Sequence, residues 1–247
     1  MRLTVLGVCG ARPEAGRASS GYLVEHDGFR LIMDLGYATF PRLLEYVPAG
    51  AVDAVLISHG HPDHCVDINP LLRARAQSDR PPPVLPLYSL AGALDAVLAL
   101  DRPGMLDAAY ALRTFRAGDG FKIGPFTVRT QALPHYVANA GFRLEADGST
   151  LAYTGDTGGG PGLTTLARDA DLLLADASFA GPAPTREEAR CLGSAPRVGR
   201  QATAAGVGRL LLTHLLPDTD PAEAERAAAG GYDGPLGVAT EGLVVEI

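Results

Sequence analysis

The segment SHGHPDHCVD, from Ser58 to Asp67, restricts what this chain can fold into more than any other feature of the sequence. In an extended chain the side chains at positions i and i+2 point the same way, so His59 and His61 can bind one cation together. Pro62 then turns the chain into a helix, whose first residues can face a second cation. The segment predicts a metal-binding loop with four ligands, namely His59, His61, Asp63 and His64.

Three further candidate ligands end apolar runs elsewhere in the chain. They are His135 in LPHY, Asp156 in YTGDTG and His214 in LLLTH. Because strand ends of two packed sheets meet at one edge of a sandwich, we expect these side chains to gather beside the first segment. Their agreement favours a metal site over the alternative, a solvated polar loop in which Asp63 merely caps a helix.

The candidate ligands are imidazole and carboxylate groups, which suit zinc and also manganese or iron. Three histidines can bind one ion and two histidines with Asp63 another, with Asp156 bridging the two. Two ions about 3.5–4 Å apart lower the pKa of a shared water and stabilise charge on the attacked centre. The sequence therefore predicts two divalent ions, with zinc preferred, and catalytic roles for Asp63 and Asp156.

Runs typical of strands, with hairpin turns, occur in both halves of the chain, and runs typical of helices follow each set. Asp27-Gly28 and Asp147-Gly148 are two-residue turns of the kind that join antiparallel strands. The predicted strands are Arg2–Val8, Gly21–His26, Phe29–Asp34, Ala54–Ser58, Phe121–Ile123, Phe126–Ala132, Gly141–Glu145, Ser149–Tyr153, Leu172–Asp176, Arg209–Thr213, Gly237–Ala239 and Val244–Ile247. The predicted helices are Val66–Gln77, Leu90–Leu100, Leu163–Arg168, Val198–Ala205 and Pro221–Ala229, and a proline-rich connector spans Arg80–Pro86.

This order of elements predicts an α/β (α+β) fold in which two mixed sheets pack face to face beneath outer helices. Both halves of the chain supply candidate ligands, so we expect one domain over residues 1–247.

The order of the seven candidate ligands along the chain resembles the full metal motif of the metallo-β-lactamase superfamily. The resemblance covers nearly the whole sequence and implies an αββα sandwich. Asp34 in LIMDLG also fits the family pattern, in which this aspartate supports the metal loop without binding an ion. The alternative for Asp34 is an ordinary turn residue at a strand end.

Several stretches are similar to the ribonuclease Z-like branch of that superfamily. They are the complete HxHxDH motif, GDT at Asp156, AGFRLE after His135, LLLTHL at His214, and MRLTVLGVCG with SSGYLVE near the N-terminus. The branch includes tRNA-processing endonucleases and phosphodiesterases that act on cyclic nucleotides. The resemblance implies a phosphodiesterase acting on a small (cyclic) nucleotide or related phosphodiester, in which Asp63 orients or deprotonates the attacking water.

The sequence departs from this branch at two places. A histidine that members usually carry in a loop aligns with Leu192, and no histidine lies between Ala138 and Thr213. Arg190 or Arg197 can take its place, or the substrate is not a phosphodiester. There is also no room for the long basic arm that tRNA-processing members use, so we expect no cleavage of pre-tRNA.

Alternative functions on the same fold therefore stay open. An acyl hydrolase, either a thioesterase or a lactonase, needs no strong acid for its leaving group. A pathway-specific biosynthetic enzyme and a non-catalytic binding protein are further alternatives, although the complete ligand set argues against the latter. A β-lactamase would need an export signal, which the N-terminus lacks.

Six polar residues lie on loops expected near the metals and are candidates for substrate binding. They are Ser19, Ser20, Tyr136, Asn139, Thr157 and Ser178. The alternative for each is a structural role, since such residues serve turns in all proteins.

Composition and charge limit the partners. The net charge of −7 argues against binding to long nucleic acids, and no apolar run approaches the roughly 20 residues of a membrane-spanning helix. Three widely spaced cysteines, Cys9, Cys65 and Cys191, indicate free thiols in a reducing compartment. We therefore expect a cytoplasmic enzyme with a small-molecule substrate, and the family analogy suggests a homodimer.

Overall fold

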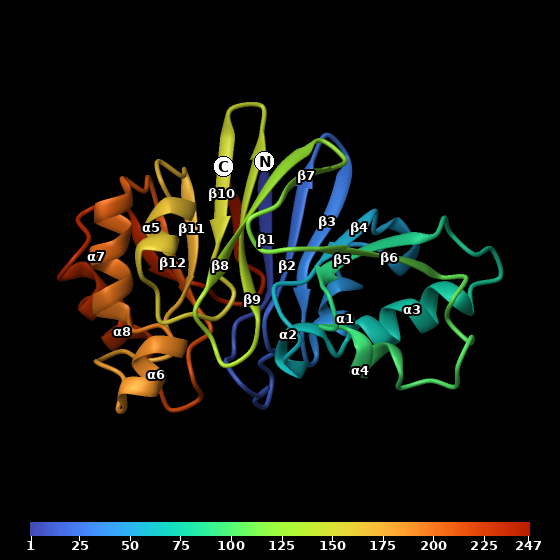
Figure 1. The fold of residues 1–247 in the computed structure, drawn as a ribbon, viewed down its shortest axis with the longest axis horizontal. Helices are drawn as coiled ribbons and strands as arrows, with labels where there is room; N and C mark the ends of the chain where they lie inside the picture. The colour runs from blue at the N-terminus through green and yellow to red at the C-terminus, as the bar shows by residue number, and fades with distance from the viewer.

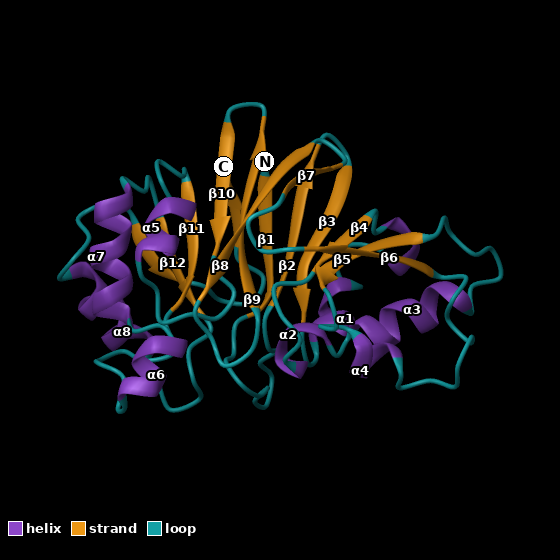
Figure 2. Cartoon of the chain, in the orientation of Figure 1, coloured by secondary structure: helices purple, strands orange, loops and turns teal.

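Two seven-stranded sheets form the centre of the computed structural model, which describes residues 1–247. They pack face to face, with helices on both outer sides (Figures 1 and 2). In spatial order the first sheet contains β14 (Val244–Glu246), β1 (Arg2–Gly7), β2 (Gly21–His26), β3 (Phe29–Leu35), β4 (Ala54–Leu56), β5 (Leu85–Leu90) and β6 (Tyr110–Phe115). The second contains β13 (Leu236–Val238), β12 (Leu210–Thr213), β11 (Leu172–Asp176), β10 (Ser149–Tyr153), β9 (Asn139–Ala146), β8 (Phe126–Leu133) and β7 (Gly120–Ile123). The predicted arrangement of two mixed sheets is confirmed.

Each sheet is half antiparallel and half parallel. In the first sheet β14, β1, β2 and β3 pair antiparallel, whereas β3, β4, β5 and β6 pair parallel. In the second, β7 to β10 pair antiparallel and β10 to β13 pair parallel. The carboxyl ends of neighbouring parallel strands lie at the same edge, where open α/β sheets bind their ligands.

The helices divide into two groups, one for each sheet. On the first sheet lie α1 (Thr39–Leu43), the short 3₁₀ turn η1 (Ala49–Ala51), α2 (Pro62–Cys65), α3 (Ile68–Ala76) and α4 (Asp95–Leu98). On the second lie α5 (Pro161–Leu166), α6 (Arg186–Cys191), α7 (Ala195–Ala205) and α8 (Pro221–Ala229). None of these helices combines the length and the apolar character needed to cross a bilayer.

Three apolar layers hold the sandwich together. Successive residues of a central strand alternate between layers: Leu31 and Met33 of β3 face the second sheet, whereas Ile32 faces the helices. Central strands such as β4, β11 and β12 are buried on both faces, which explains why they read as nearly continuous apolar runs. The third layer packs α5, α7 and α8 against the second sheet.

The region between residues 80 and 115 differs from prediction. Leu85 and Pro86, predicted as connector, belong to β5, and Leu90 ends that strand rather than beginning a helix. Only Asp95–Leu98 is helical, because Gly92 adopts a positive φ of 79° that a helix cannot contain. The neighbouring β6 and the later α6 were not predicted. Both β5 and β6 are short strands without strong alternation of apolar residues, so only the pairing of β5 with β4 and of β6 with β5 identifies them.

Removal of a side chain from the layer between the sheets should destabilise the protein. Phe142 is fully buried and packs edge-on against Phe115, with ring centroids 6.1 Å apart. We expect Phe142→Ala to lower the free energy of unfolding by about 3–5 kcal/mol, measured by denaturant titration. Leu112→Ala, at a residue 40% exposed, should change it by less than about 0.5 kcal/mol. Equal effects of the two substitutions would contradict this description of the core.

Candidate metal centre

The loop after β4 has the local geometry that the sequence predicts. His61 has extended backbone angles, with φ −71° and ψ 143°, and Pro62 occupies the first turn of α2. Asp63 and His64 therefore project from the beginning of that helix. The loop packs tightly on β3, because a Cβ added at Gly36 would lie 1.8 Å from the carbonyl oxygen of Asp63.

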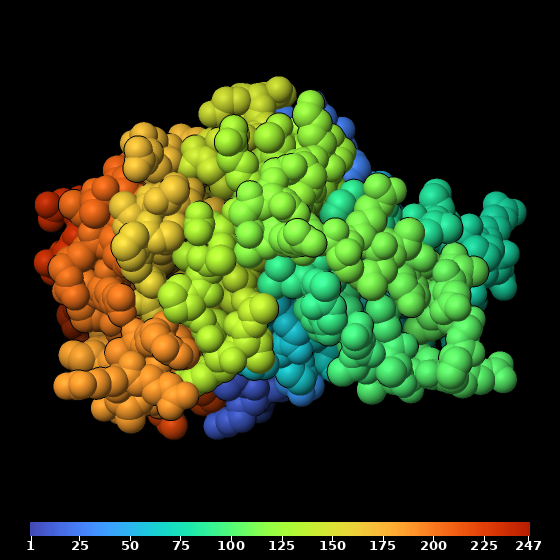
Figure 3. All heavy atoms as spheres, in the orientation of Figure 1, coloured from blue at the N-terminus to red at the C-terminus, as the bar shows by residue number.

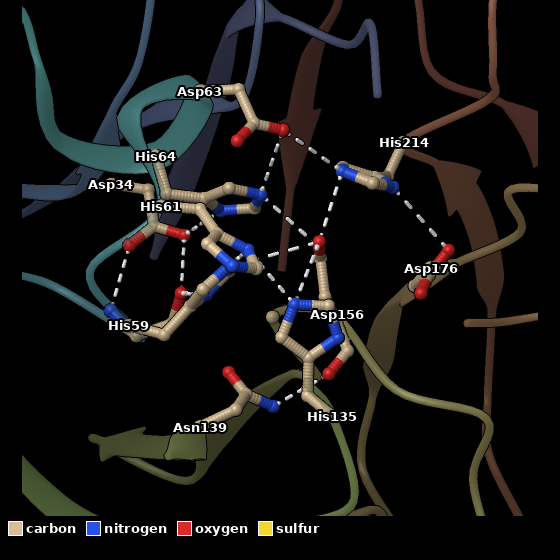
Figure 4. A network of polar contacts seen from close by, with 12 residues as sticks. Asp34, His59, His61, Asp63, His64, His135, Asn139, Asp156, Asp176 and His214 are labelled. Atoms are coloured by element: carbon tan, nitrogen blue, oxygen red, sulfur yellow. Dashed lines mark hydrogen bonds and ion pairs between the residues drawn. The ribbon is translucent and has the colours of Figure 1, made fainter. Parts of the chain in front are cut away.

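The structure brings all seven candidate ligands together from both sheets (Figure 4). His135 follows β8, Asp156 follows β10 and His214 follows β12. The donor atoms form two groups, each with its members within 4.8 Å of one another. One group is His59, His61, His135 and Asp156, and the other is Asp63, His64, Asp156 and His214.

Unprotonated nitrogens converge in the first group. Nδ1 of His135 donates to the carbonyl oxygen of Cys191 at 2.8 Å, which leaves Nε2 with its lone pair. Nδ1 of His59 lies 3.0 Å from the hydroxyl of Ser58, and that hydroxyl donates its own hydrogen to Asp34. His59 must therefore donate, and its Nε2 also carries a lone pair. These two Nε2 atoms lie 3.1 and 3.0 Å from Nδ1 of His61.

Acceptors also face one another in the second group. Nδ1 of His64 donates to Asp34 at 2.7 Å, and its buried Nε2 has no hydrogen-bond partner. Oδ1 of Asp156 is equally without a partner and lies 3.1 Å from that nitrogen. Nε2 of His214 lies 3.2 Å from the other oxygen of Asp156 and 3.4 Å from Asp63. Buried acceptors this close need a cation between them, so the donor set fits two divalent ions.

The electrostatics of the two groups agree with this fit. Burial lowers the pKa of His59 well below its usual value, and the charge of His64 lowers it further, so this imidazole is in its metal-binding form. Burial is the largest single effect on the pKa of His64 and of His214 and lowers it, but Asp156 and the other neighbouring carboxylates together outweigh burial, so both pKa values are raised. The pKa of Asp156 is lowered by His214 and His64 despite its burial. The second group therefore favours additional positive charge, which a divalent cation would supply.

Asp34 binds the loop and does not face the cavity, as its family pattern implies. It is fully buried in β3, and its Oδ1 accepts the backbone N–H of Ser58 at 2.7 Å. Its Oδ2 accepts from Ser58 Oγ, His64 Nδ1 and the hydroxyl of Tyr153, each at 2.7 Å. These contacts fix the tautomer of His64, the usual role of a carboxylate behind a metal-bound imidazole.

Asp176, at the end of β11, plays a corresponding part for His214 but was not predicted. Its Oδ1 accepts from Ser178 Oγ at 2.7 Å and lies 3.5 Å from Nδ1 of His214. Its Oδ2 accepts the N–H groups of Thr157 and Gly193, each at 2.9 Å. The available signal was its position, because LLLAD ends a strand in the same way as the segments that end at Asp156 and His214.

The six candidate substrate-binding residues lie at different depths. Five are at most 3% exposed, namely Ser19, Ser20, Asn139, Thr157 and Ser178. The side-chain amide of Asn139 donates to the carbonyl oxygen of Asp156 at 2.8 Å. The backbone N–H of Ser20 donates to the carbonyl oxygen of Asp63 at 3.1 Å. Ser178 contacts His214 through its hydroxyl. Only Tyr136, which is 47% exposed, reaches the surface above the centre, so substrate contact stays a prediction for all six.

A cavity of about 260 Å³ opens above the candidate ligands. The N-terminal segment, the metal loop and the segment near residue 135 meet at this edge, the lower one in Figure 3. The side chains that line it, apart from ligands, are Ala11, Pro62, Tyr136, Leu192 and Leu216. Two larger hollows, of about 470 and 510 Å³, contain none of the ligands.

No arginine or lysine lines this cavity. Leu192 does line it, which agrees with the sequence alignment at that position. Arg190 is exposed and is not among the lining residues, and Arg197 donates to the carbonyl oxygen of Ala189 at 2.7 Å. Neither arginine replaces the missing histidine in this structure.

Comparisons with known proteins agree with this geometry. The family described as "Beta-lactamase superfamily domain" matches residues 20–215. The "Probable metallo-hydrolase YhfI" of Bacillus subtilis is 30% identical over 253 residues, covering 100% of both chains. Its crystal structure superposes with a TM-score of 0.90 and covers 99% of each chain.

Relatives named for nucleic-acid processing are also similar over the whole chain. Ribonuclease Z of Halobacterium salinarum is 28% identical over 301 residues, covering 100% of this chain and 97% of its own. The short form of human tRNase Z shares the fold, with a TM-score of 0.82 at 22% identity and coverage of 100% and 99%. This chain therefore belongs to the metallo-β-lactamase superfamily, in its ribonuclease Z-like branch, and is a metal-dependent hydrolase.

Proposed function

We propose that this enzyme hydrolyses a small phosphodiester, such as a cyclic nucleotide, with two bound zinc ions. The observation that carries the proposal is the position of Asp156, whose carboxylate belongs to both donor groups at the floor of one cavity. The two groups named above would each hold one ion, with Asp156 as the bridge. Zinc fits because all the donors are imidazole nitrogens and carboxylate oxygens; manganese and iron would accept the same ligands.

Bound ions would supply an activated water and neutralise charge on the phosphoryl oxygens. The residues of the chain orient the reactants around them. Asp63 lines the cavity, and its Oδ2 is held by the N–H of Ala11 at 2.8 Å, so the carboxylate is placed to accept a proton from the attacking water. Leu192 and Leu216 add apolar side chains to the lining of the cavity.

A small substrate is favoured by the cavity and by the length of the chain. The cavity of about 260 Å³ has room for a mononucleotide-sized group but not for a folded RNA. The alignment with the Halobacterium ribonuclease Z spans 301 positions against 247 residues, so that relative carries segments which this chain lacks. A protein described as a diphosphatase of the PhnP family shares the fold, with a TM-score of 0.76.

A second candidate function, hydrolysis of an acyl thioester or lactone, is favoured by the lining of the cavity. Apolar side chains surround the ligands, and no cationic side chain is present to bind a phosphate. A thiolate or metal-bound alkoxide also leaves without a strong acid, which agrees with Leu192 at the position of the missing histidine.

A panel of substrates separates the two candidates. We expect zinc-loaded enzyme to hydrolyse bis-p-nitrophenyl phosphate and cyclic AMP, and to leave an acyl thioester intact. Turnover is measured from released nitrophenolate, from AMP by chromatography and from free thiol. Hydrolysis of the thioester with neither phosphodiester would reject the phosphodiesterase and support the acyl hydrolase.

The bridging position of Asp156 predicts a loss of metal. We expect the wild-type chain to bind about two zinc ions and Asp156→Asn to retain fewer, because a neutral amide cannot bridge two cations, with activity reduced about a hundredfold or more. Metal content is measured by mass spectrometry after dialysis. The control is Asp233→Asn: this aspartate is exposed, belongs to no group of potential metal ligands and should not affect the metal content. Asp156→Asn with a full metal complement would contradict the bridge.

Tyr136 offers a phenol at the mouth of the cavity, where no other uncommitted proton donor is present. We propose that it protonates the leaving oxygen. Tyr136→Phe should then lower kcat about a hundredfold for cyclic AMP, whose alkoxide needs a proton, and much less for bis-p-nitrophenyl phosphate, whose nitrophenolate does not. The same loss of kcat for both substrates would remove this role.

A further inference from the structure

We infer that Tyr153 is a positioning residue that locks the two sheets together at the metal centre, so that His64 and Asp156 stay close enough to share an ion. This inference rests on the proposed metal centre. Tyr153 ends β10 in the second sheet, and its hydroxyl donates to Oδ2 of Asp34 in the first sheet at 2.7 Å. The side chain is 1% exposed, so no water competes for this hydrogen bond.

The four donors to Asp34 come from two sources. Three belong to the metal loop that follows β4, namely the N–H and hydroxyl of Ser58 and Nδ1 of His64. The phenol of Tyr153 is the fourth, and it alone comes from the second sheet. This hydroxyl therefore makes the one hydrogen bond between the carboxylate of Asp34 and the second sheet.

The contact links the two ligands of one ion site, because Tyr153 is bonded to Asp34 and Asp34 is bonded to His64. Asp156 lies in the loop after β10, three residues beyond Tyr153, and Asp34 holds Nδ1 of His64. At the ion site itself, Nε2 of His64 and Oδ1 of Asp156 face each other at 3.1 Å, and neither atom has a hydrogen-bond partner. Without the phenol, the metal loop would still be joined to the second sheet by the hydrogen bond from the N–H of Ala140 to the carbonyl oxygen of Ser58 at 3.1 Å, but the carboxylate that holds His64 would have no hydrogen bond to that sheet.

Tyr22 provides a matched control in the same layer. It is fully buried, its ring lies 5.2 Å from that of Tyr153, and its hydroxyl also crosses between the sheets. That hydroxyl bonds to Thr213 Oγ1 at 2.7 Å and makes no hydrogen bond to Asp34. Loss of either hydroxyl removes one buried hydrogen bond from the same core, but only one of the two acts on His64.

The test compares Tyr153→Phe with Tyr22→Phe by titration of the metal-free proteins with zinc against a chromophoric chelator. For Tyr153→Phe we expect one of the two zinc equivalents to bind about tenfold more weakly or worse, with the other within about threefold of wild type. For Tyr22→Phe both equivalents should stay within about threefold. Thermal unfolding of the metal-free proteins should show similar losses of Tm for the two variants, which separates positioning from stability.

A second measurement follows His64 directly. In nitrogen-15-labelled protein with zinc bound, the Nδ1–H proton of His64 should resonate far downfield, because it is bonded to a buried carboxylate, and should shift in Tyr153→Phe but not in Tyr22→Phe. Unchanged zinc affinity in Tyr153→Phe, or equal weakening in both variants, would overturn the role of Tyr153. If the wild-type chain binds no zinc, the proposed metal centre itself fails, which is a distinct result.

Discussion

A carboxylate that is buried among imidazoles must be compensated by positive charge, and much of this structure is arranged around that requirement at Asp156. The residue is 2% exposed and lies within 3.1 to 3.8 Å of a nitrogen on each of four histidines. Hydrogen bonds occupy the outer nitrogens of these rings, so the inner nitrogens face the carboxylate. A site of this kind is stable only when it holds protons or metal ions.

The topology of the two sheets explains how such a site can form. Each sheet changes from antiparallel to parallel pairing near its middle, so several strands end at the same edge. Asp34 and Asp176 lie at the ends of β3 and β11, Asp156 follows β10 by three residues, and His214 follows β12 directly. Because the strands are held by the pairing of their backbones, the side chains at their ends are placed with little freedom, as a paired metal site requires.

The cavity above the centre shapes the chemistry as much as the ligands do. Its walls are apolar and contribute no cationic side chain, so any metal ions would have to bind and activate the substrate without such help. The phenol of Tyr136 is the one proton donor in the lining of the cavity that is not already committed to another contact. It is therefore the group that could protonate a leaving oxygen.

The sequence by itself determined the class of fold and the seven candidate ligands, because four of them lie in one short motif and three end apolar runs of obvious strand character. It also indicated Asp34 through its resemblance to a family pattern. Tertiary structure alone decided what the remaining polar residues do. The side chains of Asp176 and Tyr153 contact others more than 30 positions away, and Ser19, Ser20 and Thr157 are buried. Local patterns report which face of an element is apolar, whereas such contacts depend on how two sheets pack, which no short stretch of chain encodes.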